Sequence, residues 1–274
     1  MKPVPSRVEK LAETVLVDAH CHLDELARRG LAVADALAQA HLAGVHQVVT
    51  SGDGLDDSRQ AKELAERHPE VYFTVGWHPV NRRPPTGLEL EELRSLLSHP
   101  KAVGVGEIGL DYKFREGYME TPPALQREMF AMMLELAAEL GKPVVVHQRQ
   151  AHADLLEVLD RAPAVNAMLH CFSGDAQFAE EAQRRAMWVS FAGNLTFKSA
   201  HDLQAAARVV PAASLMVETD APFLAPSPHR GELCHPALVR ATASWLAVLR
   251  GECLETLARA TSENTRDFFH LPGA

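Results

Sequence analysis

The sequence Thr14-Val-Leu-Val-Asp18 is a short run of apolar, β-forming residues, and Ala19-His20-Cys21-His22 follows it directly. Side chains alternate along a strand, so His20 and His22 should share one face while Cys21 points the other way. A single pair of histidines is a weak signal, because two hydrogen-bonded or exposed histidines would give the same pattern. The stretch becomes informative once similar runs elsewhere in the chain are found to end in ionisable residues.

Eight short apolar runs recur along the chain, and amphipathic segments separate most of them. They are continuous rather than strictly alternating, which is typical of strands that are buried on both faces. We predict strands over residues 14–18, 45–51, 71–75, 102–106, 143–147, 165–170, 187–191 and 214–218.

The segments between these runs have the spacing of helices. The clearest is 122–140, where we expect Thr121 to cap the helix, Pro122 to open it and Gly141 to close it. Its methionine-rich face is interpreted as packing rather than as a cofactor site. Other helices are predicted over 31–43, 56–68, 88–97, 151–161, 176–185 and 199–209, with two or three more after Pro236.

Alternation of strand and helix eight times predicts an α/β fold with a parallel sheet that closes into a (β/α)₈ TIM barrel. A doubly wound open sheet is the alternative. The 274 residues, 47% of them apolar, suit a single barrel domain spanning 1–274, with 1–13 as an N-terminal extension. The net charge of −9 argues against a general nucleic-acid coat, but a few arginines and metal ions can still bind a phosphate locally.

The four cysteines are scattered, with no CxxC pair, which indicates reduced thiols. The first fourteen residues contain no apolar leader, and no apolar run approaches the ~20 residues that a membrane helix needs. We therefore expect a cytoplasmic protein without a membrane partner. The oligomeric state is left open, and a monomer is compatible with the sequence.

Four more ionisable residues stand at the carboxyl ends of predicted strands. Glu107 follows the fourth run, and His147 ends the fifth. His170 ends the sixth run, and Asp220 lies just beyond the eighth. Barrel enzymes place their chemistry at this end of the strands. Together with the first two histidines, these residues predict a site for divalent cations; a hydrogen-bonded polar network without metal is the alternative.

The number of these residues suggests two ions rather than one. A single catalytic metal needs about four protein ligands and keeps one position open, so six ligands exceed its need. A carboxylate can bridge two cations, and Glu107 is the natural candidate. Imidazole-rich ligation favours Zn²⁺ or Mn²⁺, and Mg²⁺, which prefers oxygen, is a third option.

From Asp18 to about Phe268, the chain resembles the TatD family of metal-dependent hydrolases, within the amidohydrolase-like barrels. Each matching segment is weak alone, but together and in this order they are specific. The segments are Asp18-Ala-His-Cys-His-Leu-Asp24, Gly76-Trp-His-Pro79, Gly106-Glu-Ile-Gly-Leu-Asp-Tyr112, 143–149, His170-Cys-Phe-Ser-Gly174, Glu218-Thr-Asp-Ala-Pro-Phe-Leu224, Arg230-Gly231 and Asn264-Thr265.

The resemblance implies a (β/α)₈ barrel, two divalent cations and hydrolysis, commonly the 3′→5′ removal of nucleotides from single-stranded or frayed DNA. The sequence departs from the family pattern in two places, while the six expected ligands are intact. Gln148 and Gln150 stand where Ser and Asp are expected, and Cys234 and His235 stand near the places of an Asn and an acidic residue. These departures bear on support for the ligands and on substrate contacts.

The expected roles follow from this arrangement. His20, His22 and Asp220 would hold the first ion, His147 and His170 the second, and Glu107 would bridge them. Two cations can lower the pKa of a water molecule and hold the phosphate oxygens of a bound diester. Asp220 could also accept the proton of that water. Catalytic roles are therefore expected for Asp220 and Glu107.

Substrate contacts are expected from Arg149 and His78. Arg149 could neutralise a phosphate oxygen, or it could form a surface salt bridge. His78 could contact substrate, or it could pack beside Trp77. Cys21 and Cys171 are interpreted as packing residues.

Two further groups of residues near the expected site each have two interpretations. Glu218 could support the ligands or lie at the rim of the core. Tyr112, Lys113 and Arg115 could shape a cleft for single-stranded nucleic acid, or form a solvated loop.

Three functions are compatible with the sequence. The first is a nuclease, which phosphate-binding arginines favour and the two departures from the family pattern weaken. The second is a hydrolase of a carboxyl ester, lactone or amide, for example the ester of a misacylated tRNA, because the same ligands serve attack on carbonyl carbon. The third is a non-enzymatic metal-binding scaffold, which the open ligand set disfavours.

Overall fold

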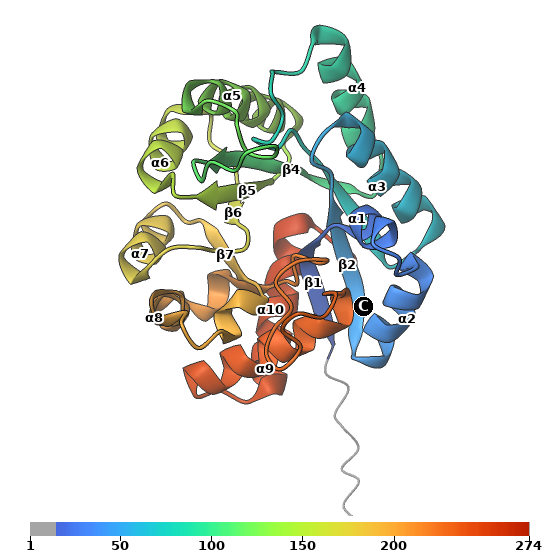
Figure 1. Ribbon diagram of the computed structural model, residues 1–274, viewed down its shortest axis with the longest axis vertical. Helices are drawn as coiled ribbons and strands as arrows, with labels where there is room; N and C mark the ends of the chain where they lie inside the picture. The colour runs from blue at the N-terminus through green and yellow to red at the C-terminus, as the bar shows by residue number, and fades with distance from the viewer. Residues whose placement is uncertain (1–14, 274) are drawn as a thin grey trace, which may run out of the picture.

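The computed structural model describes residues 15–273 and shows eight strands enclosed by helices (Figure 1). All neighbouring strands pair in parallel, and their order in the sheet follows their order in the chain. The strands are β1 (Leu16–Cys21), β2 (Val45–Ser51), β3 (Val71–Val75), β4 (Ala102–Asp111), β5 (Val144–Arg149), β6 (Ala167–Leu169), β7 (Trp188–Phe191) and β8 (Leu215–Val217). The predicted (β/α)₈ barrel is confirmed, and the open sheet is excluded. The expected extension 1–13 lies outside the described residues.

The barrel closes between β8 and β1 at the carboxyl ends of these strands. The Asp220 amide donates to the His20 carbonyl at 3.0 Å, and the His22 amide donates to the Ala221 carbonyl at 2.6 Å. An isolated parallel bridge between Cys21 and Ala221 lies in the same place. Closure of the barrel therefore brings together three of the predicted metal ligands.

Three strands extend further than the sequence indicated. β1, β4 and β5 continue through His20, Glu107 and His147, which were expected to follow the strands or end them. The cause for β4 and β5 is continued pairing, since Gly109 aligns with His147 beyond the apolar run. Polar residues at the mouth of a barrel do not look like strand residues in the sequence, so the predicted ends were wrong.

Helices follow most strands, and the predicted ones are present with small shifts at their ends. They are α2 (Val33–Leu42), α3 (Leu55–Arg67), α4 (Gly87–Leu97), α5 (Pro123–Leu140), α6 (His152–Arg161), α7 (Ala176–Arg184), α8 (His201–Val209), α9 (Val239–Arg250) and α10 (Leu254–Phe269). Short 3₁₀ segments lie at Gly193–Thr196, Ala212–Ser214 and Pro236–Leu238.

Two local predictions about helices were wrong. Helix α1 (Leu23–Arg28) was not predicted; it has only six residues, with Leu23 and Leu26 buried. The cap of α5 is Pro122 rather than Thr121, whose hydroxyl donates instead to the Asn81 carbonyl at 3.1 Å. Closure of α5 by Gly141 in the left-handed conformation is as expected.

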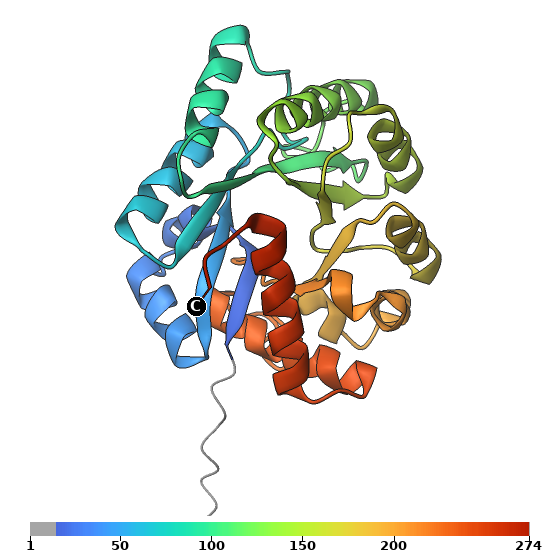
Figure 2. The same cartoon turned by 180° about the vertical axis from the view of Figure 1, so that it is seen from behind.

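The lower part of the barrel interior is an apolar core that the last helix covers. Val17, Ala19, Val49, Val103, Val145, Met168 and Met216 form one buried cluster with Phe268, Phe269 and Leu271 of the C-terminal segment. Helix α10 faces the viewer in Figure 2 and lies behind the strands in Figure 1. A second, larger cluster fills the layer between strands and helices. No helix in residues 15–273 is long and apolar enough to cross a membrane.

Candidate metal centre

Glu107 of β4 lies at the centre of the polar mouth and is only 3% exposed. Its Oε2 lies 3.3 Å from Nε2 of His20 and 3.4 Å from Nε2 of His22. Its Oε1 lies 2.6 Å from Nδ1 of His147 and 2.8 Å from Nε2 of His170. The two carboxylate oxygens therefore face two different pairs of histidines.

Asp220 completes the first of these groups. Its Oδ1 lies 3.8 Å from Nε2 of His20 and 3.7 Å from Nε2 of His22. The ligand atoms of these three residues lie within 4.8 Å of one another. The six residues predicted as ligands thus converge at one end of the barrel, although they come from five strands or strand ends.

The donor set fits divalent cations. Nε2 of His20 and Nε2 of His22 face each other at 3.2 Å, and Nδ1 of His147 and Nε2 of His170 face each other at 3.4 Å. Each pair also faces an oxygen of Glu107. Imidazole nitrogens that converge with carboxylate oxygens in a buried site are the ligands that Zn²⁺ and similar ions prefer.

The electrostatics of the mouth favour positive charge. Burial raises the pKa of Glu107, but the charges of His170 and His78 lower it. The lowering is the larger effect, so the pKa of this carboxyl is held well below its usual range. Burial lowers the pKa of His170, but the charges of Glu107 and Glu218 raise it well above its usual value. The pKa of His20 is lowered, first by burial and then by the charge of His170. Glu107 therefore stays ionised although it is buried.

Carboxylates outside the ligand set contact the far nitrogens of the histidines. Oε1 of Glu218 lies 3.3 Å from Nδ1 of His170 and accepts from the Cys171 amide at 2.9 Å. Oδ2 of Asp111 lies 3.4 Å from Nε2 of His147. Such contacts fix the orientation of ligand rings. Glu218, for which support of a ligand or a place at the core rim was suggested, is fully buried and contacts His170, one of the proposed ligands.

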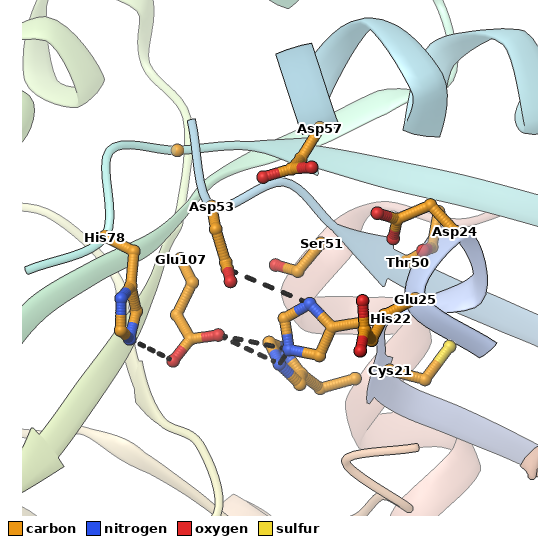
Figure 3. Close-up of polar contacts among 12 residues, drawn as sticks. Cys21, His22, Asp24, Glu25, Thr50, Ser51, Asp53, Asp57, His78 and Glu107 are labelled. Carbon is orange, nitrogen blue, oxygen red and sulfur yellow. Dashed lines mark hydrogen bonds and ion pairs between the residues drawn. The ribbon is translucent and has the colours of Figure 1, made fainter. Parts of the chain in front are cut away.

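Asp53 makes the corresponding contact with His22, whose Nδ1 lies 3.8 Å from Oδ1 of Asp53 (Figure 3). Neither Asp53 nor Asp111 was singled out in the sequence. Each had a signal, because Asp53 follows β2 by two residues and Asp111 ends β4. An acidic residue at or just beyond the end of a strand is easily read as part of a loop.

The backbone around Glu107 is also tightly specified. A Cβ atom on Gly76, just after β3, would collide with the backbone nitrogen of Glu107. Only glycine permits this close approach, so the segment after β3 helps to fix the position of Glu107.

The mouth opens into a cavity of about 800 Å³. Both predicted substrate contacts line it. His78 is buried, and its Nε2 lies 3.4 Å from Oε1 of Glu107, so it faces the ligands rather than merely packing beside Trp77 (Figure 3). Arg149 forms no ion pair with any residue of 15–273, and it is a half-buried residue of the cavity wall. The salt-bridge alternative for Arg149 is therefore not observed.

Cys171 lines this cavity, so its interpretation as a packing residue was wrong. Its backbone φ of 40° departs from the strand alternation on which that interpretation was based. Cys21, in contrast, is fully buried in the outer core, as expected.

In the loop after β4, some residues make contacts away from the cavity or are exposed, and others line the cavity. The Tyr112 hydroxyl donates to Oδ2 of Asp154 at 2.7 Å, and Lys113 is exposed. Arg115 lines the cavity and pairs with Asp111.

The residues that depart from the family pattern lie in different surroundings in the structure. Gln148 lines the cavity, and its amide donates to the Ser173 hydroxyl at 2.9 Å. Gln150 is exposed. Cys234 is fully buried, and His235 precedes the last 3₁₀ segment. Gln148 is the departure that can touch a bound substrate.

Comparison with known proteins places this geometry in a family. Residues 17–270 match the model of the family described as TatD related DNase. YcfH, an uncharacterized metal-dependent hydrolase of Escherichia coli (strain K12), is 38% identical over 260 residues, or 93% of this chain and 96% of that protein. The 3′-5′ ssDNA/RNA exonuclease TatD of Citrobacter rodentium is 34% identical over 253 residues, or 86% of this chain and 91% of that protein.

Solved structures agree with the fold. The crystal structure of YJJV, a TatD homologue from Escherichia coli K12, is 28% identical with a TM-score of 0.83, covering 95% of this chain and 100% of that one. A TatD family hydrolase from Entamoeba histolytica has a TM-score of 0.81 at 17% identity, covering 94% of this chain and 99% of that one, which supports the fold alone.

Proposed function

The chain belongs to the TatD related DNase family of metal-dependent hydrolases, and on that premise we propose that it removes nucleotides from the 3′ ends of single-stranded or frayed DNA with two divalent cations. The observation that carries the two-cation proposal is the position of Glu107. Its two oxygens face separate pairs of histidines.

The proposed ligands divide accordingly. His20, His22 and Asp220 would hold one cation, His147 and His170 would hold the other, and Glu107 would be shared between them. Zn²⁺ or Mn²⁺ suits this imidazole-rich set better than Mg²⁺. The bound cations supply Lewis acidity, which activates water near neutral pH and offsets charge on phosphate oxygens.

The other steps fall to side chains of this chain. Asp220 lines the cavity and can accept a proton from the attacking water. Arg149 can donate charge-assisted hydrogen bonds to a phosphate oxygen. His78 can orient the substrate beside Glu107. An unpaired arginine in the cavity wall favours an anionic substrate, and the exonuclease names of relatives such as that of Citrobacter rodentium support a nucleic acid.

The test is hydrolysis by the purified protein of oligonucleotides labelled at the 3′ or 5′ end, before and after treatment with a chelator. We expect stepwise loss from the 3′ end, abolished by chelation and restored to different degrees by Mn²⁺, Zn²⁺ and Mg²⁺. Full activity in metal-stripped protein would refute the metal mechanism. A carboxyl ester or amide, such as a misacylated tRNA, that is cleaved far faster than any oligonucleotide would refute the nuclease.

A further inference from the structure

Two partly exposed aromatic side chains stand at the rim of the metal cavity. Tyr118, in the loop between β4 and α5, is 45% exposed, and Phe223, in the loop between β8 and α9, is 40% exposed. Both line the same cavity as Glu107 and Arg149. They come from opposite halves of the chain, so the mouth has aromatic surface from two independent loops.

Each ring is backed by an arginine. The guanidinium of Arg115 lies 4.4 Å from the centre of the Tyr118 ring, and that of Arg29 lies 4.8 Å from the centre of the Phe223 ring. Acidic side chains hold the arginines in turn, since Arg115 pairs with Asp111 and Arg29 pairs with Glu25. A ring fixed in this way loses little freedom when a ligand stacks on it.

The backbone holds both rings close to the proposed ligands. Residues Arg115 and Met119 form an antiparallel bridge, and Met119 is buried, which anchors the small turn that carries Tyr118. The Phe223 amide donates to the Asp220 carbonyl at 2.9 Å, and the Phe223 ring lies 6.2 Å from the His22 ring, centre to centre.

We propose that Tyr118 and Phe223 are specificity residues that receive unpaired nucleobases of a strand whose phosphate lies in the metal cavity. This assignment rests on the proposed nuclease function and deepens it. Stacking on an aromatic face tolerates any base, because every base has a π face. It requires bases that are free of a duplex, so it selects single-stranded ends. Partial burial, followed by the charges of Asp53 and Glu107, raises the pKa of Tyr118 to about 12, which keeps its ring neutral beside a polyanion.

The arrangement explains how an acidic chain can bind nucleic acid. The overall charge of −9 opposes binding through a broad basic surface. Two stacking surfaces, and Arg149 with no ion pair to any described residue, instead give local affinity at the cavity. Peptides offer no regular series of flat rings, so the pair of platforms favours a single-stranded nucleic acid over a peptide substrate.

The experiment compares Tyr118→Leu and Phe223→Leu with two controls. Tyr118→Phe retains the ring and removes the hydroxyl. Trp245→Leu removes an aromatic side chain that is 41% exposed on α9 and does not line the cavity. Fluorescence anisotropy measures the binding of a labelled oligothymidylate with hydrolysis-resistant phosphorothioate linkages to metal-loaded protein, and a matched oligonucleotide with abasic 3′-terminal positions supplies the phosphates without the bases.

We expect each leucine variant to weaken binding of oligothymidylate by about fivefold to a hundredfold. Tyr118→Phe should restore the binding lost in Tyr118→Leu, and Trp245→Leu should match the parent protein. The abasic strand should bind the parent protein more weakly, and the leucine substitutions should weaken it no further.

The proposal is overturned if the parent protein binds abasic and intact strands equally, or if the leucine variants lose as much affinity for the abasic strand. Its failure is distinguishable from failure of the nuclease function. Parent protein that degrades oligothymidylate while Tyr118→Leu and Phe223→Leu do so equally well would keep the nuclease and reject the platforms. Parent protein that binds intact strands through these rings but cleaves none would keep the platforms and reject the nuclease.

Discussion

The interior of the barrel has two ends with opposite chemistry. At the base, Val17, Val103 and Met168 pack with one another beneath Phe269 of α10. At the mouth, the same strands carry histidines and carboxylates around Glu107, which is equally buried. A buried polar group is tolerated only when it has partners, whereas buried apolar groups stabilise the fold by leaving water. The base therefore supplies stability, and the mouth uses some of that stability to hold a reactive site.

The largest effect should follow from Glu107→Ala at the mouth. Loss of the central carboxylate removes the contact shared by both groups of ligands, so kcat should fall by about a thousandfold or more for every substrate. Steady-state kinetics on an oligonucleotide and on a small phosphodiester measure the effect. Residual activity within about tenfold of the parent protein would show that Glu107 is not central.

Removal of a large side chain at the base should lower the stability of the fold and leave activity nearly unchanged. Phe269→Ala should lower the free energy of unfolding by about 3–5 kcal/mol, because it opens a cavity in a packed core. Denaturant unfolding measures this loss, and kcat of the folded fraction should change little. If Phe269→Ala instead abolished activity in folded protein without loss of stability, the separation of the two ends would be wrong.

A smaller loss is expected from Glu218→Gln, which keeps the shape and removes the charge that faces His170. Residues that orient ligand histidines typically contribute ten- to hundredfold to metal affinity or activity. Metal titration followed by calorimetry should show weaker binding of that order, and oligonucleotide and ester substrates should lose activity alike. Unchanged metal affinity would mean that Glu218 is only a core residue.

The smallest effect, and the one most dependent on substrate, should come from Arg149→Ala. One charge-assisted contact contributes roughly 1.5–3 kcal/mol, or about a ten- to hundredfold change in kcat/KM. The loss should appear with phosphodiesters and be much smaller with uncharged esters. If Arg149→Ala leaves DNA hydrolysis unchanged while a carboxyl ester is the better substrate, the hydrolase acts on carbonyl carbon instead.

The two ends also differ in how far the sequence could predict them. The barrel could be predicted because buried parallel strands are continuous apolar runs at regular intervals. The six proposed ligands could be found because they stand where those runs stop. The convergence of His20 and Asp220, about two hundred residues apart, followed from the prediction that the strands close into a barrel, and the hydrogen bond between their backbones is part of that closure.

Other features could not be predicted for physical reasons. Helix α1 has six residues, too few for a periodic pattern, and its buried leucines rather than helix propensity hold it in place. Asp53 contacts His22, and Asp111 contacts His147. These contacts join residues far apart in the sequence, at no regular spacing that a pattern could reveal. Cys171 faces the cavity because of a positive φ, which no propensity indicated.

The most direct test of the central claim is the metal content of the purified protein, measured by inductively coupled plasma mass spectrometry after dialysis against Zn²⁺ or Mn²⁺. We expect two ions per chain. Asp220→Ala and His147→Ala should each lose one ion, and Glu107→Ala should lose both. Folded parent protein that retains no ion, or a single ion that Asp220→Ala and His147→Ala both leave in place, would contradict a two-cation centre.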